Sequence, residues 1–189
     1  MTRSRRASTS SRRIDVLVVC TGNLCRSPMI ATMLSYALPG LVIRSAGTHA
    51  AVGQPWHPLT FEVLAESGYH VRGRAVQLRK PHVRDAKLIL TAEAMHRGVV
   101  AAMDDSARDR TYTLIEAARL LRDVPARDGI GPAPLALHLA LALRMRPAEF
   151  NDDLADPLLG ELSDFRACLR RARRAVDGLL PALGDQKRP

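Results

Sequence analysis

Short runs rich in β-branched and aliphatic residues alternate with helical patterns along most of the chain, and this alternation restricts the folds it can adopt. Four runs read as strands, at residues 14–19, 41–47, 86–93 and 110–114. The segments with helical periodicity are residues 27–38, 57–68, 92–103, 115–121, 135–146 and 164–180. Strands that alternate with helices pair in parallel and are covered on both faces. The sequence therefore predicts an α/β fold with a four-stranded parallel sheet flanked by helices on both faces.

The chain divides into one patterned domain and two unpatterned ends. We expect residues 1–13, which are rich in serine, threonine and arginine and lack periodicity, to form a disordered basic tail. Residues 14–180 read as a single domain, and residues 181–189 as a second disordered tail. Within the domain, a connector rich in proline and glycine leads into one extra helix, so residues 123–148 are predicted to form a helical insertion.

Cysteine content and apolar runs bear on the compartment in which the protein works. Cys20, Cys25 and Cys168 are too few and too oddly numbered for a disulfide framework, which favours a reducing environment. No run approaches the roughly 20 apolar residues of a membrane span. The apolar run at residues 14–19 is shorter than that of a signal peptide and lacks a small-residue cleavage site. We expect a cytoplasmic protein with no membrane partner.

The chain carries a net charge of +9, which raises the question of a nucleic-acid partner. Five arginines lie in the N-terminal tail and five more between Arg166 and Arg174. The second group alternates with apolar residues at helical spacing, so it forms the solvated face of an amphipathic helix. The apolar side of that helix contains Phe165, Leu169, Ala172, Val176 and Leu179. Because no nucleic-acid-binding motif accompanies either group, we expect no nucleic acid as partner, although the positive potential should attract anionic substrates.

The sequence VCTGNLCRSP begins at the end of the first predicted strand. Cys20 stands at the carboxyl end of that strand, the edge where parallel sheets bind ligands. Gly22 permits and Asn23 tolerates a positive φ, so successive backbone N–H groups can point inward as an anion-binding nest. A helix with Ser27 at its N-cap and Pro28 at its first position adds its positive end to this nest. The loop is predicted to bind a phosphate-sized anion through Thr21, Gly22, Asn23, Leu24, Cys25, Arg26 and Ser27.

Cys20 and Arg26 give this loop the groups of a covalent catalyst. A thiol beside N–H donors, a helix N-terminus and an arginine is favoured as the thiolate, which is the nucleophilic form. The planar guanidinium of Arg26 can hold two phosphoryl oxygens, and Ser27 can donate a hydrogen bond to the sulfur. The alternative is a buried structural cysteine followed by an ordinary helix cap. That alternative leaves the combination with Gly22 and Asn23 unexplained.

The segment V-C-T-G-N-L-C-R-S-P resembles the signature of the low-molecular-weight protein tyrosine phosphatases. Three further segments resemble the same family, namely SAGTHA at 45–50, LILTAEAMHR at 88–97 and YTLIEAARLL at 112–121. The resemblance extends over most of residues 14–180, whereas the insertion at 123–148 has no counterpart. It implies a phosphatase that works without a metal or a cofactor, in which Ser45 holds Asn23 and thereby shapes the phosphate loop.

Phosphoryl transfer also requires a proton for the departing oxygen. The segment NDDLADPLLG offers Asp152, Asp153 and Asp156, and Asp164 lies close behind it. The residues alone leave these four open. The resemblance selects Asp156, because the family places its acid in an Asp-Pro pair and only Asp156 precedes a proline here. It further implies that Cys20 forms a phosphocysteine while Asp156 protonates the leaving group and then activates water.

Positions around the acid depart from the family pattern. Leu158 and Leu159 stand where the family usually has tyrosines that wall the slot for an aromatic ring, and Ala50 occupies a further aromatic position. We expect these three residues to form the substrate wall, which leaves the preference for phosphotyrosine over other phosphate esters open. Trp56 is expected to pack at a helix start. The resemblance implies a phosphotyrosine protein as partner, with a bacterial tyrosine kinase as one candidate, and a monomer or weak dimer as the working state.

Two roles are open for Cys25, which lies in the same loop as Cys20. In the family a neighbouring cysteine can form a reversible disulfide with the oxidised nucleophile, and such a bond protects the nucleophile from further oxidation. The other role is structural, with the thiol packed under the loop as a small apolar group.

Two other functions are open at this point. A thiol-dependent arsenate reductase of the same fold would need a resolving thiol, and Cys168 is the one spare cysteine. A non-catalytic regulator would bind phosphoproteins or nucleic acid through the basic tail, but it would have no use for Asp156. The six histidines show no paired metal-ligand spacing and are expected at the surface or in helix caps: His49, His57, His70, His82, His96 and His138.

Overall fold

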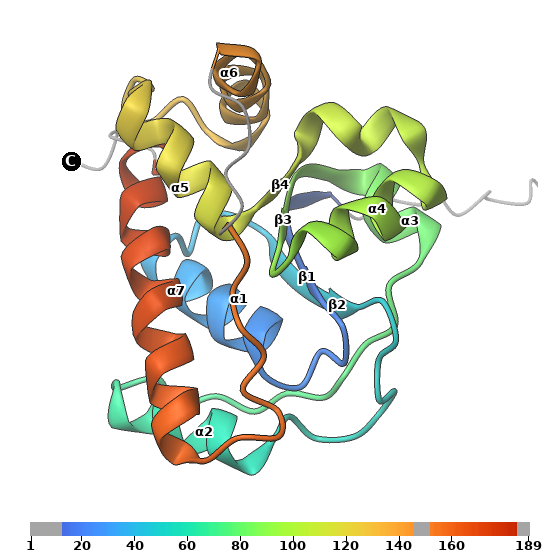
Figure 1. Cartoon of the computed structure of the whole chain (residues 1–189), viewed down its shortest axis with the longest axis vertical. Coiled ribbons are helices and arrows are strands. Elements are labelled where there is room, and N and C mark those ends of the chain that lie inside the picture. Colours follow the sequence, from blue (N-terminus) through green and yellow to red (C-terminus); the bar gives the residue numbers. More distant parts are fainter. Residues whose placement is uncertain (1–12, 146–151, 185–189) are drawn as a thin grey trace, which may run out of the picture.

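The computed structural model describes residues 13–145 and 152–184 of the chain, which form a sheet with helices on both sides (Figure 1). The four strands lie in the order β2-β1-β3-β4. Their bounds are β1 Ile14–Cys20, β2 Ile43–Gly47, β3 Ala86–Thr91 and β4 Thr111–Thr113. Every pairing is parallel, with Val18 opposite Ser45 on one side and Leu90 on the other. The predicted α/β fold with a four-stranded parallel sheet is confirmed.

Two hydrophobic clusters cover the two faces of the sheet. Successive side chains of a strand point to opposite faces, so Val16 and Val18 join one cluster and Leu17 and Val19 join the other. The larger cluster lies under α1 Arg26–Ala37, α2 Pro58–Glu66, α5 Leu114–Asp123, α6 Pro132–Met145 and α7 Leu162–Leu183. The smaller cluster lies under α3 Lys80–Asp85, α4 Ala94–Met103 and the 3-10 helix η1 Asp105–Arg110. Figure 1 shows α1 and α7 on one side of the sheet and α3 and α4 on the other.

The arginine-rich helix α7 lies with its apolar side on the core, as its pattern predicts. The five apolar residues assigned to that side are all buried: Phe165, Leu169, Ala172, Val176 and Leu179. Four of its arginines are exposed: Arg166, Arg170, Arg171 and Arg174. The helix continues through Pro181 to Leu183, so the first three residues assigned to the C-terminal tail are helical.

The segment predicted as a helical insertion is built into the core. Its helix α6 buries Leu135 against the larger cluster. Its connector binds the end of α7, because the N–H of Gly129 donates to the carbonyl of Pro181 at 2.8 Å and that of Gly131 to the carbonyl of Ala182 at 3.0 Å. The last carbonyls of a helix have no partner within the helix. The connector therefore supplies donors that the end of α7 lacks.

Several element boundaries differ from the predicted ones. Helix α1 begins at Arg26 with Cys25 at its N-cap, so the assignment of Ser27 to the N-cap and Pro28 to the first helical position is wrong. The side chain of Ser27 bonds to Cys20 and Asn23 instead of capping the helix. Parts of the expected tails and insertion, residues 1–12, 146–148 and 185–189, lie outside the described residues. Across the two described ranges, no helix is both long enough and apolar enough to cross a membrane.

Candidate active site

The buried side chain of Asn23 organises the loop between β1 and α1. Its Nδ2 donates to Ser27 Oγ and to Ser45 Oγ, each at 2.9 Å, and its Oδ1 accepts the backbone N–H of Val76 at 2.8 Å. Asn23 has a φ of 53°, whereas Gly22 does not take a positive φ, so the expected left-handed turn falls on the asparagine alone. Such a φ is tolerated by asparagine better than by most residues. The side-chain amide of Asn23 thus holds the backbone turn in place through its hydrogen bonds to Ser27, Ser45 and Val76.

Gly47, at the end of β2, lets this loop lie directly against the sheet. A Cβ at this position would lie 2.4 Å from the carbonyl oxygen of Thr21 and 2.9 Å from the N of Asn23. The residues that follow Gly47 bind the loop, because the N–H groups of Thr48 and His49 donate to the carbonyls of Cys20 and Thr21 at 2.9 Å. This role of Gly47 was not predicted from the sequence. The one sequence feature that could have indicated this close approach is the glycine itself, in the segment SAGTHA.

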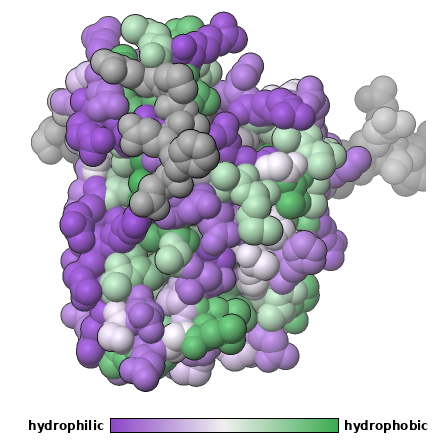
Figure 2. Space-filling model, viewed as in Figure 1, coloured by the Kyte–Doolittle hydropathy of each residue, from purple (hydrophilic) through white to green (hydrophobic). Residues whose placement is uncertain are grey.

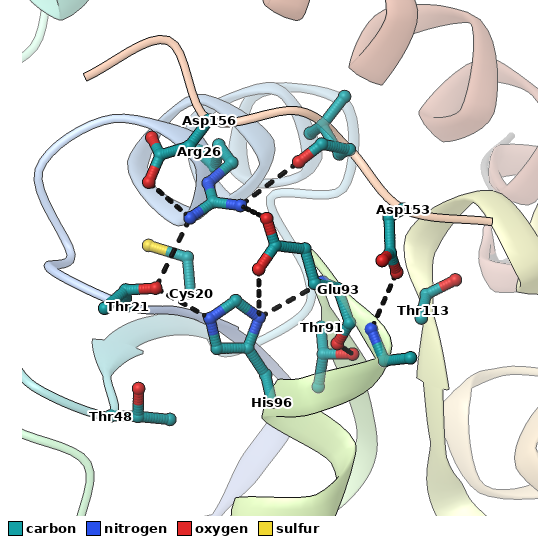
Figure 3. A network of polar contacts seen from close by, with 12 residues as sticks. Cys20, Thr21, Arg26, Thr48, Thr91, Glu93, His96, Thr113, Asp153 and Asp156 are labelled. Atoms are coloured by element: carbon teal, nitrogen blue, oxygen red, sulfur yellow. Dashed lines mark hydrogen bonds and ion pairs between the residues drawn. The ribbon is translucent and has the colours of Figure 1, made fainter. Parts of the chain in front are cut away.

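Cys20 is the last residue of β1, and its side chain lies close to Thr21 and Arg26 (Figure 3). Cys20 is only 2% exposed, and its Sγ lies 2.9 Å from Ser27 Oγ. Ser27 Oγ also accepts the hydrogen bond from Asn23, and its hydroxyl hydrogen has two possible acceptors, the sulfur at 2.9 Å and the more distant carbonyl of Ala46 at 3.5 Å. The hydroxyl therefore can donate to a Cys20 thiolate, which is the interaction expected from the sequence.

Arg26 brings three separate segments together around the loop. Its guanidinium is almost fully buried and forms ion pairs with Glu93 and with Asp156, the second at 2.5 Å. It also donates to the carbonyl of Leu154 at 3.1 Å and to Thr21 Oγ1 at 3.4 Å. Its Nε has no partner among the described residues. A buried polar group without a partner is costly, so this nitrogen is a candidate donor to a bound anion.

Of the four aspartates that the sequence left open, Asp156 is the one beside Arg26. Its Oδ1 accepts the N–H of Leu158 at 3.2 Å, and its side chain is 37% exposed. The other three have structural partners. Asp152 forms an ion pair with Arg119 at 2.8 Å, Asp153 accepts the N–H of Ala94 at 2.7 Å, and Asp164 accepts the N–H of Glu161 at 2.8 Å. The geometry thus separates one aspartate from its neighbours in the sequence.

Glu93 and His96, at the start of α4, complete the polar network (Figure 3). The Nδ1 of His96 accepts the backbone N–H of Glu93 at 3.1 Å, so the ring proton is on Nε2, which lies 2.9 Å from Thr21 Oγ1. Burial, together with the nearby Arg26, lowers the pKa of His96, so the ring is neutral. The expected capping role of His96 is confirmed, but its link to the loop was missed. The described residues contain no group of three or more His, Cys, Asp and Glu arranged to hold a metal ion.

The residues expected as a substrate wall differ widely in exposure. Leu159 is 99% exposed, whereas Leu158 is half-buried against the larger core cluster. Ala50 is half-buried and its N–H donates to the side chain of Gln77 at 3.0 Å. Trp56 stacks on Phe61 with ring centroids 5.8 Å apart, which is the packing role expected for it.

The remaining cysteines are buried thiols. Cys20, Cys25 and Cys168 are all free. Burial raises the pKa of Cys25 and of Cys168 to about 12 in each case. Both join the larger core cluster, with 3% and 6% of their residue surface exposed. The packing role left open for Cys25 is present in this structure.

Comparisons with known proteins place the chain in a family. The sequence profile described as "Low molecular weight phosphotyrosine protein phosphatase" matches residues 15–124, which include the Cys20 loop. The chain is 31% identical over 173 residues to a protein-arginine-phosphatase of Geobacillus stearothermophilus, covering 91% of this chain and 97% of that protein. It is 38% identical over 98 residues to the low molecular weight protein-tyrosine-phosphatase Etp of Escherichia coli K12, covering 51% of this chain and 66% of that protein.

Solved structures agree with these sequence comparisons. The crystal structure of the tyrosine phosphatase AmsI of Erwinia amylovora superposes with a TM-score of 0.69 at 27% identity, covering 90% of this chain and 93% of that one. The chain belongs to the low molecular weight phosphotyrosine protein phosphatase family. The resemblance stated from the sequence is therefore confirmed. The profile ends before Asp156, so the match does not cover this aspartate.

Replacing Gly47 by alanine tests the close approach of β2 to the loop. The added Cβ would meet backbone atoms of Thr21 and Asn23, which cannot rotate away. We expect Gly47→Ala to weaken binding of inorganic phosphate at least tenfold and to lower the free energy of unfolding by about 1–3 kcal/mol. Calorimetric titration and urea unfolding measure the two effects. Gly40→Ala is the control, because its Cβ would meet nothing within 4 Å. Phosphate affinity in Gly47→Ala equal to that of wild type would contradict this role.

Alkylation tests the state of the two buried thiols. Because burial raises the pKa of Cys25 and Cys168 to about 12, both remain protonated at pH 8. We expect iodoacetamide at pH 8 to leave both unlabelled in the folded protein and to label all three cysteines after denaturation. Peptide mass spectrometry reads out each site. Rapid labelling of Cys25 in the folded protein would show that its thiol is accessible and more acidic than the structure indicates.

Proposed function

We propose that this protein is a cysteine-dependent phosphatase that hydrolyses phosphate monoesters of the phosphotyrosine type through a phosphocysteine intermediate. One observation carries the proposal: Asp156, which lies 130 positions after Arg26 in the sequence, meets it at the loop that carries Cys20. Membership of the family supports the same reaction class. The proposed phosphate cradle consists of Thr21, Gly22, Asn23, Leu24, Cys25, Arg26 and Ser27.

The first step of the proposed reaction is attack of the Cys20 thiolate on phosphorus. A sulfur–phosphorus bond forms while the bond between phosphorus and the ester oxygen breaks. Asp156, in its protonated form, gives its proton to the departing oxygen. Arg26 and the loop amides stabilise the charge on the phosphoryl oxygens. The contact of Arg26 with Asp156 supports this arrangement, because it holds the acid beside the group that would bind the phosphoryl oxygens.

The second step returns the enzyme to its starting state. The Asp156 carboxylate takes a proton from water, and the water oxygen attacks phosphorus. The sulfur–phosphorus bond breaks, which releases phosphate and restores the Cys20 thiolate. The hydrogen bond from Ser27 supports the sulfur as leaving group, because it stabilises the thiolate.

Phosphotyrosine proteins are the proposed substrates, and a bacterial tyrosine kinase is the proposed partner. The half-buried Leu158, next to Pro157 and the acid, supports an aromatic ring as leaving group. Phosphoarginine is a second candidate, because the protein-arginine-phosphatase relative is matched over 97% of its length. The three free cysteines support a reducing, cytoplasmic location. The buried thiol of Cys168 counts against a resolving role in arsenate reduction.

The test is the initial rate of p-nitrophenyl phosphate hydrolysis in the absence of metal. We expect Cys20→Ser to lose essentially all activity, because it lacks the nucleophile. The rate of Asp156→Ala should fall by about 10²–10⁴, because hydrolysis of the phosphocysteine then lacks its general base. Cys168→Ala and Asp153→Asn are matched controls of the same residue types outside the proposed chemistry, and both should keep most of the rate.

Three outcomes would redirect the assignment. Inactive wild type that reduces arsenate with a thiol would make the protein a reductase. Inactive wild type that only binds phosphate would make the loop a binding site, and nucleic acid would then be tested as a ligand of the basic tail. If wild type hydrolyses a phosphoarginine peptide faster than a phosphotyrosine peptide, the second candidate replaces the first.

A further inference from the structure

Five arginines line a groove between α5 and α7. Its volume is about 800 Å³. Small residues on α7 form part of its lining, among them Ala167, Ala175 and Gly178. The charged residues around it are Arg119, Arg122, Arg170, Arg171, Arg174 and Asp152. Figure 2 shows hydrophilic residues gathered on the side of the molecule where α5 and α7 lie in Figure 1.

The single carboxylate of this lining does not balance its positive charge. Asp152 is largely buried and is bound by Arg119, with contacts of 2.8 and 3.2 Å. Outside the lining, Asp123 lies 3.6 Å from Arg122. Arg170 and Arg174 are exposed on α7, and neither forms an ion pair with any residue in the described ranges. Arg170 and Arg174 therefore give the groove excess positive charge, and guanidinium groups bind carboxylates and phosphates in preference to neutral groups.

The groove lies next to a hollow that the proposed catalytic acid lines. A second hollow of about 290 Å³ lies between α7 and the segment that carries Asp156, and Asp156 is part of its lining. Ala167 and Arg171 line both the groove and this hollow. Asp152, at the groove, lies four residues before Asp156 on the same segment, which Figure 1 shows running past α7. The arginine groove and the hollow beside Asp156 are thus neighbours along α7, so an extended polypeptide that passes Asp156 would meet the arginines.

We propose that the groove binds an acidic segment of the protein substrate, on the same polypeptide as the phosphorylated residue. The proposal rests on the proposed phosphatase function, since it adds a second contact for the substrate of that site. The adjacency of the groove to the hollow beside Asp156 favours a polypeptide over a free anion. The lining contains no aromatic side chain, and aromatic stacking is the usual means of holding single-stranded nucleic acid. The groove would thus select phosphoproteins in which acidic residues accompany the phosphorylated one.

The test compares phosphotyrosine peptides that differ only in charge. Each peptide has four residues on either side of the phosphotyrosine. In the first the four residues after it are glutamates, in the second the four before it are glutamates, and all the other flanking positions are glutamine. The third has glutamine at all eight positions. For wild type we expect one glutamate peptide to have a kcat/KM about five- to tenfold above that of the glutamine peptide, mostly through a lower KM. The preference should shrink in 1 M NaCl, because salt screens exposed charges.

The variant that carries the prediction is Arg170→Ala/Arg174→Ala. We expect it to hydrolyse the glutamate and glutamine peptides with equal kcat/KM. The control is Arg44→Ala/Arg84→Ala, which removes two exposed arginines that do not line the groove. It should retain the preference. Both variants should hydrolyse p-nitrophenyl phosphate at the wild-type rate, because this ester has no acidic segment.

The outcomes separate this inference from the proposed function. If wild type does not hydrolyse p-nitrophenyl phosphate, the proposed phosphatase function is refuted, and the docking proposal is refuted as well. An active wild type that shows no preference for either glutamate peptide overturns the docking proposal alone, as does a preference that persists in Arg170→Ala/Arg174→Ala. Binding of single-stranded nucleic acid that this variant abolishes, without any peptide preference, would assign the groove to nucleic acid and also overturn the proposal.

Discussion

The buried guanidinium of Arg26 is the contact on which the site depends. It binds Thr21 in the loop after β1, Glu93 at the start of α4, and Asp156 on the segment before α7. An unpaired charge at such a depth would be very costly, so its partners must be present for the site to be stable. The same pairs fix the positions of three segments that the sequence keeps far apart. The ion pairs and hydrogen bonds of Arg26 therefore both stabilise the site and set the arrangement of its segments.

The two carboxylates on Arg26 differ in what surrounds them. Glu93 is held at the N-terminus of α4, where its backbone N–H bonds His96, and its side chain is 20% exposed. Asp156 lies on a segment without regular structure and its side chain is 37% exposed. A phosphate entering the loop would compete for the guanidinium, and Asp156 is the partner with more freedom to move. This difference suits Glu93 to orienting Arg26 and Asp156 to exchanging a proton.

Much of the fold and the centre of the site could be predicted from the sequence, because they depend on local patterns. Runs of β-branched residues predict the strands. The spacing of Cys20, Asn23 and Arg26 predicts the loop. The start of α1 could not be predicted, since it depends on Ser27 bonding back to Cys20 rather than capping the helix. The link between His96 and the loop escaped prediction for a similar reason. Its contact with Thr21 joins residues 75 positions apart, and no local pattern encodes such a contact.

Detection of the covalent intermediate tests the central claim most directly. Asp156→Ala would be mixed with p-nitrophenyl phosphate, quenched in acid within one turnover, and digested for mass spectrometry. Nitrophenolate leaves without protonation, whereas hydrolysis of the intermediate lacks its base, so a phosphocysteine should accumulate. The account predicts one phosphoryl group on the peptide that contains Cys20 and none on the peptide that contains Cys168. Release of nitrophenolate without any phosphorylated cysteine, or with phosphate on another residue, would contradict it.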